Sequence, residues 1–141
     1  MSLFKWSSAH SVYLPEIDAE HRAIYRLGDE LHKALLAGGG PAQLNPILEN
    51  LLESAERHFR HEESLMRAMH YTALGWHKRQ HDAARKRAKA LAKRIAGGDA
   101  AAAEELLQFL SVWLRDHMAV ADRMMGAYLR NYLRFNTSLA S

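Results

Sequence analysis

The sequence predicts an all-α protein, an antiparallel up-down-up-down four-helix bundle with an N-terminal arm. Apolar residues recur at three- and four-residue steps in four long segments, which is the period of a helix with one buried face. Glycine and proline residues separate these segments, and none of them shows the alternation of a strand. The loops between the segments are short, which favours antiparallel packing of consecutive helices.

The bulk composition is that of one globular domain, which we expect to span residues 1–141. Hydrophobic residues make up 48% and charged residues 25% of the chain, both ordinary values. Cysteine is absent, so any metal must be held by nitrogen and oxygen ligands. No apolar stretch reaches the roughly 18 residues of a membrane span, and the first residues do not resemble a signal peptide. We therefore expect a cytoplasmic protein without a membrane partner.

Residues 1–17 lack a sustained period, and their apolar side chains predict an arm that packs across the bundle. The first helix is expected over about 18–37, with Asp18 as its N-cap and Gly38 after its end. Its buried stripe consists of Ile17, His21, Ile24, Leu27, Leu31 and Leu35.

The second helix is expected over about 45–69, with Asn45 as cap and Pro46 at the first helical position. A turn near residues 70–72 leads into a third helix over about 73–96, which Gly97 and Gly98 end. The fourth helix is expected over about 100–132. Its stripe consists of Leu106, Leu110, Trp113, Leu114, His117, Ala121, Met125 and Tyr128.

The third segment is strongly basic, although the net charge of the whole chain is only +3. Nucleic-acid binding is one reading of such a segment. No aromatic residue interleaves with the charges, as base stacking would require. We therefore interpret the segment as a solvated helix face and expect no nucleic-acid partner.

Two pairs of residues at i,i+4 spacing predict a metal site inside the bundle. His58 with Glu62, and His77 with His81, each share one helix face, with Cβ atoms about 5–6 Å apart. In this topology these pairs lie toward the same end of the bundle as three further polar residues on buried stripes. The complete set is His21, His58, Glu62, His77, His81, His117 and Asp122.

Each of these histidines alone would be read as a hydrogen-bonded core residue. Buried carboxylates are costlier, because an interior carboxylate must be neutralised, paired or bound to a metal. The agreement in depth of all seven residues favours a metal site over seven separate core residues. One spacing fits badly, because His117 and Asp122 are i,i+5. Asp122 must reach sideways, or the helix must contain a π-bulge.

The ligand count favours a binuclear site with one open position. If two carboxylates and one solvent-derived group bridge two ions, five histidines divide three and two between six-coordinate metals. A closed structural site would leave no vacancy. Iron, manganese and zinc all suit imidazole with carboxylate. Neutral imidazoles favour reduced ions, and hence uptake and release of dioxygen more than its cleavage.

The sequence resembles the hemerythrin family, specifically its single-domain bacterial members. The matching stretches are 17–21, 58–63, 71–81 and 113–117 together with Asp122. The resemblance implies reversible dioxygen binding at a non-haem di-iron centre with an oxo or hydroxo bridge. It assigns His77, His81 and His117 to the saturated iron, His21 and His58 to the open iron, and Glu62 and Asp122 to bridging positions. It also implies an oxygen pocket lined by Phe59, Trp113, Leu114 and Met118.

Three positions depart from the family pattern. Thr72 stands where proline often follows the tyrosine, Tyr13 where glycine is common, and Met118 where isoleucine is usual. Methionine is flexible and oxidisable, so Met118 bears on pocket volume and oxygen lifetime.

Two other functions are open on the same scaffold. One is a di-iron enzyme, acting as an oxidase, a peroxidase or a nitric-oxide-handling protein. Such an enzyme needs a proton source near the open iron, and only Tyr13 on the arm offers one. The other is a sensor that acts through a separate partner. We expect an oxygen-binding protein rather than an enzyme, and a monomer whose partner is dioxygen.

Overall fold

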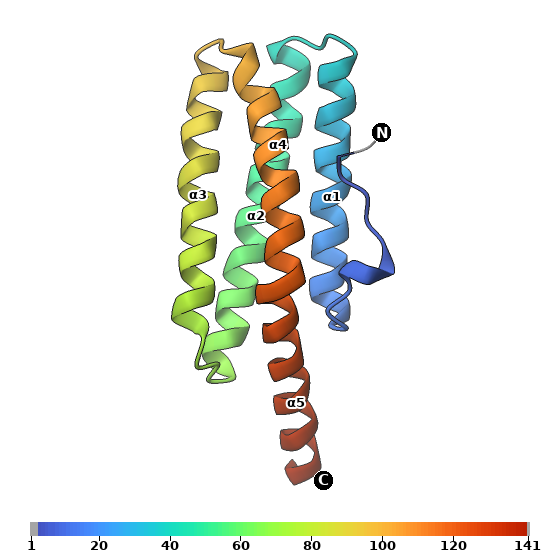
Figure 1. Cartoon of the computed structure of the whole chain (residues 1–141), viewed down its shortest axis with the longest axis vertical. Coiled ribbons are helices and arrows are strands. Elements are labelled where there is room, and N and C mark those ends of the chain that lie inside the picture. Colours follow the sequence, from blue (N-terminus) through green and yellow to red (C-terminus); the bar gives the residue numbers. More distant parts are fainter. Residues whose placement is uncertain (1–2, 141) are drawn as a thin grey trace.

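The computed structural model describes residues 3–140, with side chains described as far as Asn136, and it confirms the antiparallel four-helix bundle (Figure 1). Helices account for all the regular secondary structure of the described residues. The elements are η1 (Ser8–His10), α1 (Pro15–Leu36), α2 (Pro41–Ala68), α3 (Leu74–Ala96), α4 (Ala100–His117), the π-helical turn η2 (Met118–Asp122) and α5 (Arg123–Ala140). No helix of the described residues combines the length and the apolar character needed to cross a membrane.

Helix α1 begins at Pro15 rather than at residue 18, so the prediction of Asp18 as its N-cap is wrong. Proline suits the first helical position, because its missing N–H would have no partner there. Asp18 lies in the first turn, where its carboxylate accepts hydrogen bonds from the Ser11 hydroxyl at 2.6 Å and from the Val12 N–H at 2.9 Å. Asp18 therefore fastens the arm to α1.

Helix α2 begins at Pro41, and the predicted start at Asn45 and Pro46 is also wrong. Pro46 lies inside the helix, early in its second turn. At this position proline removes one backbone hydrogen bond close to the helix start. The loop between α1 and α2 is correspondingly shorter than expected.

The predicted fourth helix is a single rod made of α4, η2 and α5, and it is longer than the expected 100–132. Its last part, α5, projects beyond the ends of the other helices (Figure 1). The rod is interrupted only by the π turn, which lies between His117 and Asp122.

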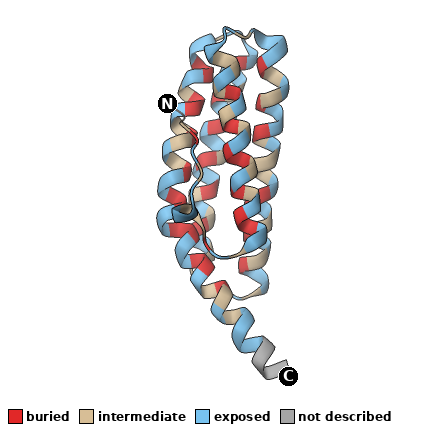
Figure 2. Cartoon of the chain, turned by 90° about the vertical axis from the view of Figure 1, so that its right-hand side faces the viewer, coloured by how far each residue is buried: buried red, intermediate tan, exposed pale blue. Residues whose placement is uncertain are grey.

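Buried residues follow the inward faces of the helices along the whole bundle (Figure 2). They form two apolar clusters. The larger one fills the end with the α1–α2 and α3–α4 loops and includes Leu51, Leu91 and Leu106. The smaller one lies at the other end and consists of Met66, Tyr71, Met125 and Leu129 with partly buried neighbours. Along α2 and the fourth rod, the buried polar residues come between the two clusters.

Candidate metal centre

The seven residues singled out by their spacing meet in the interior of the bundle. Helix α1 supplies one of them, α2 and α3 supply two each, and the rod of α4 and η2 supplies the last two. None is more than 4% exposed: His21, His58, Glu62, His77, His81, His117 and Asp122.

The seven side chains form two overlapping groups that share the two carboxylates. One group combines Glu62 and Asp122 with His77, His81 and His117, and the other combines the same carboxylates with His21 and His58. Within each group, one nitrogen or oxygen atom per residue lies within 4.8 Å of all the others. Two neighbouring cation positions with shared oxygen ligands fit this arrangement.

Several of these atoms approach one another without forming hydrogen bonds. His21 Nε2 lies 3.1 Å from Asp122 Oδ2, and His81 Nε2 lies 3.0 Å from Glu62 Oε1. Both nitrogens nevertheless lack a hydrogen-bond partner among the protein atoms, as do both oxygens of Asp122. Unsatisfied buried polar atoms are costly, and a metal ion between them removes that cost. The residues present therefore fit a metal.

The π turn brings His117 and Asp122 together although they are i,i+5. A π-bulge was one of the two alternatives predicted for this spacing. A π turn adds one residue to the helical repeat, so His117 and Asp122 come to the same side of the rod. His117 Nε2 lies 3.1 Å from Asp122 Oδ1 and 3.1 Å from His77 Nε2. In the second of these contacts the Nε2 atoms of His117 and His77 face each other. Both nitrogens could bind the same metal ion, and the contact then needs no proton between them.

Three polar side chains contact the outer ring nitrogens of three of the histidines, a role that was not predicted from the sequence. His58 Nδ1 lies 2.7 Å from Glu20 Oε1, His81 Nδ1 lies 2.8 Å from Glu63 Oε2, and His117 Nδ1 lies 2.8 Å from Gln80 Oε1. With such acceptors, each Nδ1 carries the proton and each Nε2 is free to bind a metal.

These three acceptors follow one rule. Each is the sequence neighbour of a site residue on its own helix, and each accepts from a histidine on the next helix: Glu20 beside His21, Glu63 beside Glu62, Gln80 beside His81. A neighbouring residue points about 100° around the helix, toward the adjacent helix of the bundle. A polar residue next to each site residue was the signal in the sequence.

Arg85 supports His81 from two sides. Its guanidinium group donates two hydrogen bonds to the Glu63 carboxylate, at 2.8 and 3.2 Å, and a third to Glu56 at 2.8 Å. It also lies over the Phe59 ring, 5.3 Å from the centroid, and that ring stacks on His81 at 4.2 Å. Glu63 and Phe59 are thus both fixed by one cation.

Without a metal, the site holds protons in its place. Burial lowers the pKa of His58, but Glu62 and Glu20 outweigh burial and raise that pKa to about 10. Burial also opposes charge on His77, whose pKa the two carboxylates raise to about 9. The pKa of Glu62 is well below its usual value, because His58 and the other histidines outweigh the effect of burial. A histidine must be neutral to bind a metal, so metal binding would release these protons to solvent.

Of the four residues expected in an oxygen pocket, Phe59 and Trp113 stack on histidines of the site. Phe59, Leu114 and Met118 are buried, and Trp113 stacks on His117 with ring centroids 4.4 Å apart. Phe59 and Leu114 also line a cavity of about 450 Å³ between α2 and α3, with Arg85 and Lys89 among its lining residues. The seven site residues themselves are at most 4% exposed, which keeps them out of contact with bulk water.

Tyr13, the one proton source expected near the pocket, points away from it. Its side chain is 71% exposed and packs against Arg130, whose guanidinium carbon lies 5.3 Å from the ring centroid. Its φ of 59° is left-handed, a conformation that glycine adopts without strain. The structure thus gives a reason for glycine at this position and leaves Tyr13 outside the site.

The other four histidines of the chain are half-buried or exposed. His70 is exposed at the α2–α3 turn, and His32 lies on α1 away from the site. His10 contacts Trp6 and Tyr25 in the arm region. His61 does more than the sequence indicated, because it shares the Glu20 carboxylate with His58, with Nδ1 2.8 Å from Glu20 Oε2.

Comparisons with known proteins give one consistent answer. The family model described as hemerythrin HHE cation binding domain matches residues 13–129. A bacteriohemerythrin of Methylococcus capsulatus is 26% identical, with 92% of this chain and 98% of the relative covered. A bacteriohemerythrin of Clostridium acetobutylicum is 29% identical, with 86% and 97% covered. A crystal structure of a hemerythrin point mutant aligns with a TM-score of 0.84 at 25% identity, covering 92% of this chain and 98% of its own.

Proposed function

Because this chain belongs to the hemerythrin family, we propose that it binds dioxygen reversibly at a non-haem di-iron centre, for oxygen storage, delivery or sensing. The observation that carries this proposal is the pair of overlapping ligand groups, which share Glu62 and Asp122 and divide five histidines three and two. This is the division that leaves one of two six-coordinate ions with an open position.

In this proposal His77, His81 and His117 hold one iron, and His21 and His58 hold the other. Glu62 and Asp122, which belong to both ligand groups, would provide carboxylate ligands to both ions, with an oxo or hydroxo group as the further bridge that the family resemblance implies. Two iron ions would supply the electrons that dioxygen takes up on binding and returns on release. The chain orients three of the five imidazoles through acceptors on the outer ring nitrogens of His58, His81 and His117.

The surroundings of the site support a carrier more than an enzyme. Cleavage of bound oxygen needs a proton donor, and Phe59, Trp113, Leu114 and Met118 offer no acidic proton. Tyr25 follows His21 by one helical turn, but burial raises its pKa to about 12, which makes it a poor acid at neutral pH. Exclusion of bulk water from the buried site residues favours release of dioxygen unchanged.

The test is anaerobic loading with ferrous iron, followed by repeated exchange of air and argon while the visible spectrum is recorded. We expect two iron atoms per chain by elemental analysis and a spectrum that alternates over several cycles. Iron at one atom per chain would contradict the binuclear site. A spectrum that never reverses, together with steady turnover of peroxide, would favour the enzyme.

Two histidine variants test the division of ligands between the ions. His58→Ala leaves the open iron with His21 as its only imidazole, so we expect reversible oxygenation to be lost. His77→Ala removes a ligand from the saturated iron, where solvent can replace it, so partial reversibility should remain. Met118→Ile should retain both iron atoms and the reversible spectrum and change only affinity or lifetime. Reversible cycling in His58→Ala would show that the open iron is assigned to the wrong histidines.

A further inference from the structure

The cavity between α2 and α3 has the size and the lining of a small-molecule site. Its volume is about 450 Å³, within the range of about 300–1,000 Å³ that ligand pockets span. All four helices of the bundle contribute walls, because α1 supplies Ile24 and α4 supplies Leu110 and Leu114 to the lining. Most of the lining residues are apolar. The charged ones among them are Glu56, Arg85 and Lys89.

Alanine residues leave the space that forms this cavity. Ala55 lines it from α2, and Ala84, Ala88 and Ala92 line it from α3, where they recur at i,i+4 spacing on one helix face. On both α2 and α3 the lining extends over eight residue steps, which correspond to about 12 Å at 1.5 Å per residue. An extended alkyl chain gains about 1.2 Å per bond, as an extended backbone does, so about ten carbon atoms match this length.

The charged residues at the cavity differ in their partners. The Arg85 guanidinium is paired with three carboxylates, and Glu56 accepts a further hydrogen bond from Arg60 at 2.9 Å. Lys89 is exposed, and it makes no hydrogen bond or ion pair with the described residues. The cavity therefore combines apolar walls with one ammonium group that has no carboxylate partner.

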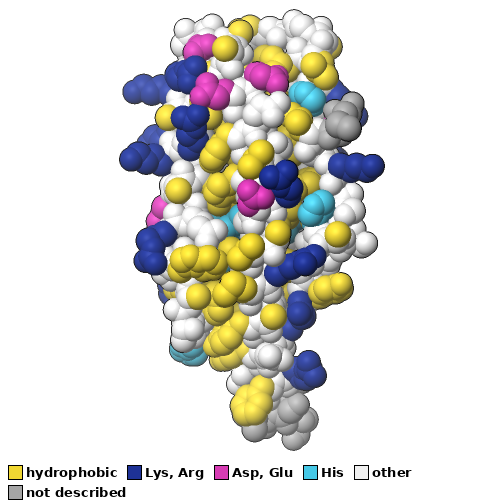
Figure 3. Space-filling view, in the orientation of Figure 1, with side chains coloured by type: hydrophobic (Ala, Val, Ile, Leu, Met, Phe, Trp, Pro, Cys, Tyr) yellow, Lys and Arg dark blue, Asp and Glu magenta, His cyan; other side chains and the backbone are white. Residues whose placement is uncertain are grey.

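The surroundings of Lys89 are also positive. Helix α3 contains eight lysines and arginines and only one acidic residue, Asp82, which is paired with Lys78 and Arg85. Figure 3 shows basic side chains projecting along the side of the molecule that α3 forms. A surface of one charge sign attracts ligands of the opposite sign. An anionic head group is thus favoured at the cavity over a cationic one.

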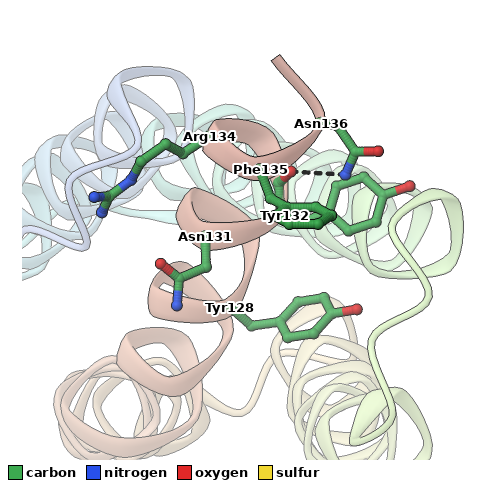
Figure 4. Close-up of a pocket in the computed structure, with 6 residues that line it drawn as sticks. All are labelled: Tyr128, Asn131, Tyr132, Arg134, Phe135 and Asn136. Atoms are coloured by element: carbon green, nitrogen blue, oxygen red, sulfur yellow. Dashed lines mark hydrogen bonds between the residues drawn. The ribbon is translucent and has the colours of Figure 1, made fainter. Parts of the chain in front are cut away.

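The hollow on the projecting end of α5 lacks such an enclosure. All of its lining residues come from α5, and Figure 4 shows them along this one helix. Ligand sites bury most of the surface of the molecule they bind, which a single helix cannot do. The α2–α3 cavity, with walls from four helices, can surround an alkyl chain.

We propose that the α2–α3 cavity binds a straight-chain fatty acid of medium length, with the alkyl chain between the apolar walls and the carboxylate beside Lys89. The inner wall of the cavity includes Phe59, whose ring stacks on His81 at 4.2 Å. A bound chain therefore contacts a residue that packs against the metal centre. The binding itself does not depend on the proposed oxygen function.

Isothermal titration calorimetry of the iron-loaded protein with straight-chain carboxylates tests the proposal. From hexanoate to decanoate we expect the affinity to rise by about fourfold for each added methylene, the effect of burying one such group. For chains longer than the cavity this gain should disappear. Decyltrimethylammonium, which has the same alkyl chain and a cationic head, should bind more weakly than decanoate. Absence of decanoate binding at millimolar concentration would overturn the proposal, and so would equal affinity for the cationic compound.

Two pairs of variants locate the ligand. Lys89→Glu should weaken decanoate binding by about fivefold or more, the effect of an exposed ion pair. Lys93→Glu is its matched control, because Lys93 is exposed one turn further along α3 and does not line the cavity. Ala55→Leu should abolish binding by filling the cavity, whereas Ala90→Leu, at an exposed residue outside the lining, should not.

Iron content and helical circular dichroism should be the same in all four variants and the wild type. The surface change Lys89→Glu keeps the test decisive even if Ala55→Leu disturbs the fold. Wild-type affinity for decanoate in Lys89→Glu would show that the carboxylate does not lie beside Lys89. Wild-type affinity in a correctly folded Ala55→Leu would show that the alkyl chain binds elsewhere. Either result would overturn the proposal.

Discussion

At the scale of single residues, the site depends on side chains that never touch the metal. The Arg85 guanidinium holds Glu63 through two hydrogen bonds, and Glu63 accepts the outer N–H of His81. The Arg85 guanidinium also lies over the Phe59 ring, which in turn stacks on His81. Loss of such supporting groups typically costs about 10- to 100-fold in metal affinity.

We therefore expect Arg85→Gln to weaken iron binding by about 10-fold or more, measured by competition with a ferrous chelator under argon. Arg87→Gln is the control, because Arg87 pairs with Glu105 on the surface, at 2.7 Å, and not with a residue around the site. It should bind iron as tightly as the wild type. Equal affinities in the two variants would show that His81 does not need the support of Arg85.

The pKa values of His58 and His77 predict how the metal-free protein responds to pH. Both are raised, to about 10 and about 9, above the ordinary value of about 6.5 in the unfolded chain. A raised histidine pKa stabilises the fold fully below pH 6.5, and the stabilisation is lost as pH rises through 9 to 10. The pKa of Glu62 is lowered, so its contribution is present above the ordinary carboxyl range and is lost in acid.

We expect the melting temperature of the metal-free protein to fall by several degrees between pH 7 and pH 10. His58→Gln should flatten this dependence, because it removes the group with the higher of the two pKa values. Differential scanning fluorimetry in the presence of a chelator measures both. A metal-free wild type whose melting temperature is constant over this range would contradict the protonated state of the site.

At the scale of whole elements, the arm is held by a close approach to α5. A Cβ atom at Gly126 would lie 2.9 Å from the Val12 carbonyl oxygen and 3.0 Å from Val12 Cβ. Both neighbours are at or next to the backbone of the arm, so neither can move aside cheaply. Gly126 therefore lets the arm contact the helix, and Arg130 then donates to the same carbonyl.

We expect Gly126→Ala to destabilise the protein by about 1–3 kcal/mol, the usual cost of overpacking. Gly75→Ala is the matched control on α3, because the nearest atom to its Cβ is the end of the Arg79 side chain at 3.6 Å. It should stabilise by up to about 1 kcal/mol through helix propensity. Urea denaturation of both variants measures the difference, and equal effects would show that the arm does not pack closely on α5.

The helices could be predicted because each carries an unbroken apolar stripe. The π turn was one of two alternatives that the i,i+5 spacing of His117 and Asp122 left open. Helix ends were less predictable. Asp18 has the residue type of an N-cap, but its partners are arm residues brought to it by the tertiary fold. Neither glycine nor proline follows Tyr132. The sequence therefore contains no local signal for the residue at which α5 ends.

The seven site residues share a depth that topology alone predicts, and the structure brings them together. Their supporting acceptors require the order of helices around the bundle as well. Glu20 is adjacent to His21 in sequence, but it serves His58 on the neighbouring helix. A reading of one helix at a time cannot find such a contact. The role of Arg85 is harder still to predict, because the basic residues around it in the sequence indicate only a solvent-exposed helix face.

At the scale of the whole molecule, the metal site separates two cores of unequal size. The larger cluster joins many residues, including Leu51, Leu91 and Leu106, whereas the smaller one has only four buried members. Between them, the metal-free site leaves several buried nitrogen and oxygen atoms without partners. The smaller cluster is therefore attached to the rest of the protein through the weakest layer of the bundle.

Removal of iron should consequently loosen one end of the protein more than the other. A ligand that binds only the folded state adds about 2.7 kcal/mol of stability at 100 times its dissociation constant, and this contribution is lost with the metal. We expect hydrogen exchange to accelerate in residues 62–74 and 121–132 of the metal-free protein, and to change little in residues 88–110. Mass spectrometry of peptides from metal-free and iron-loaded samples measures this pattern. Equal acceleration along the whole chain would show that the two clusters unfold as one unit. Unchanged exchange at both ends would show that the metal contributes nothing to the fold.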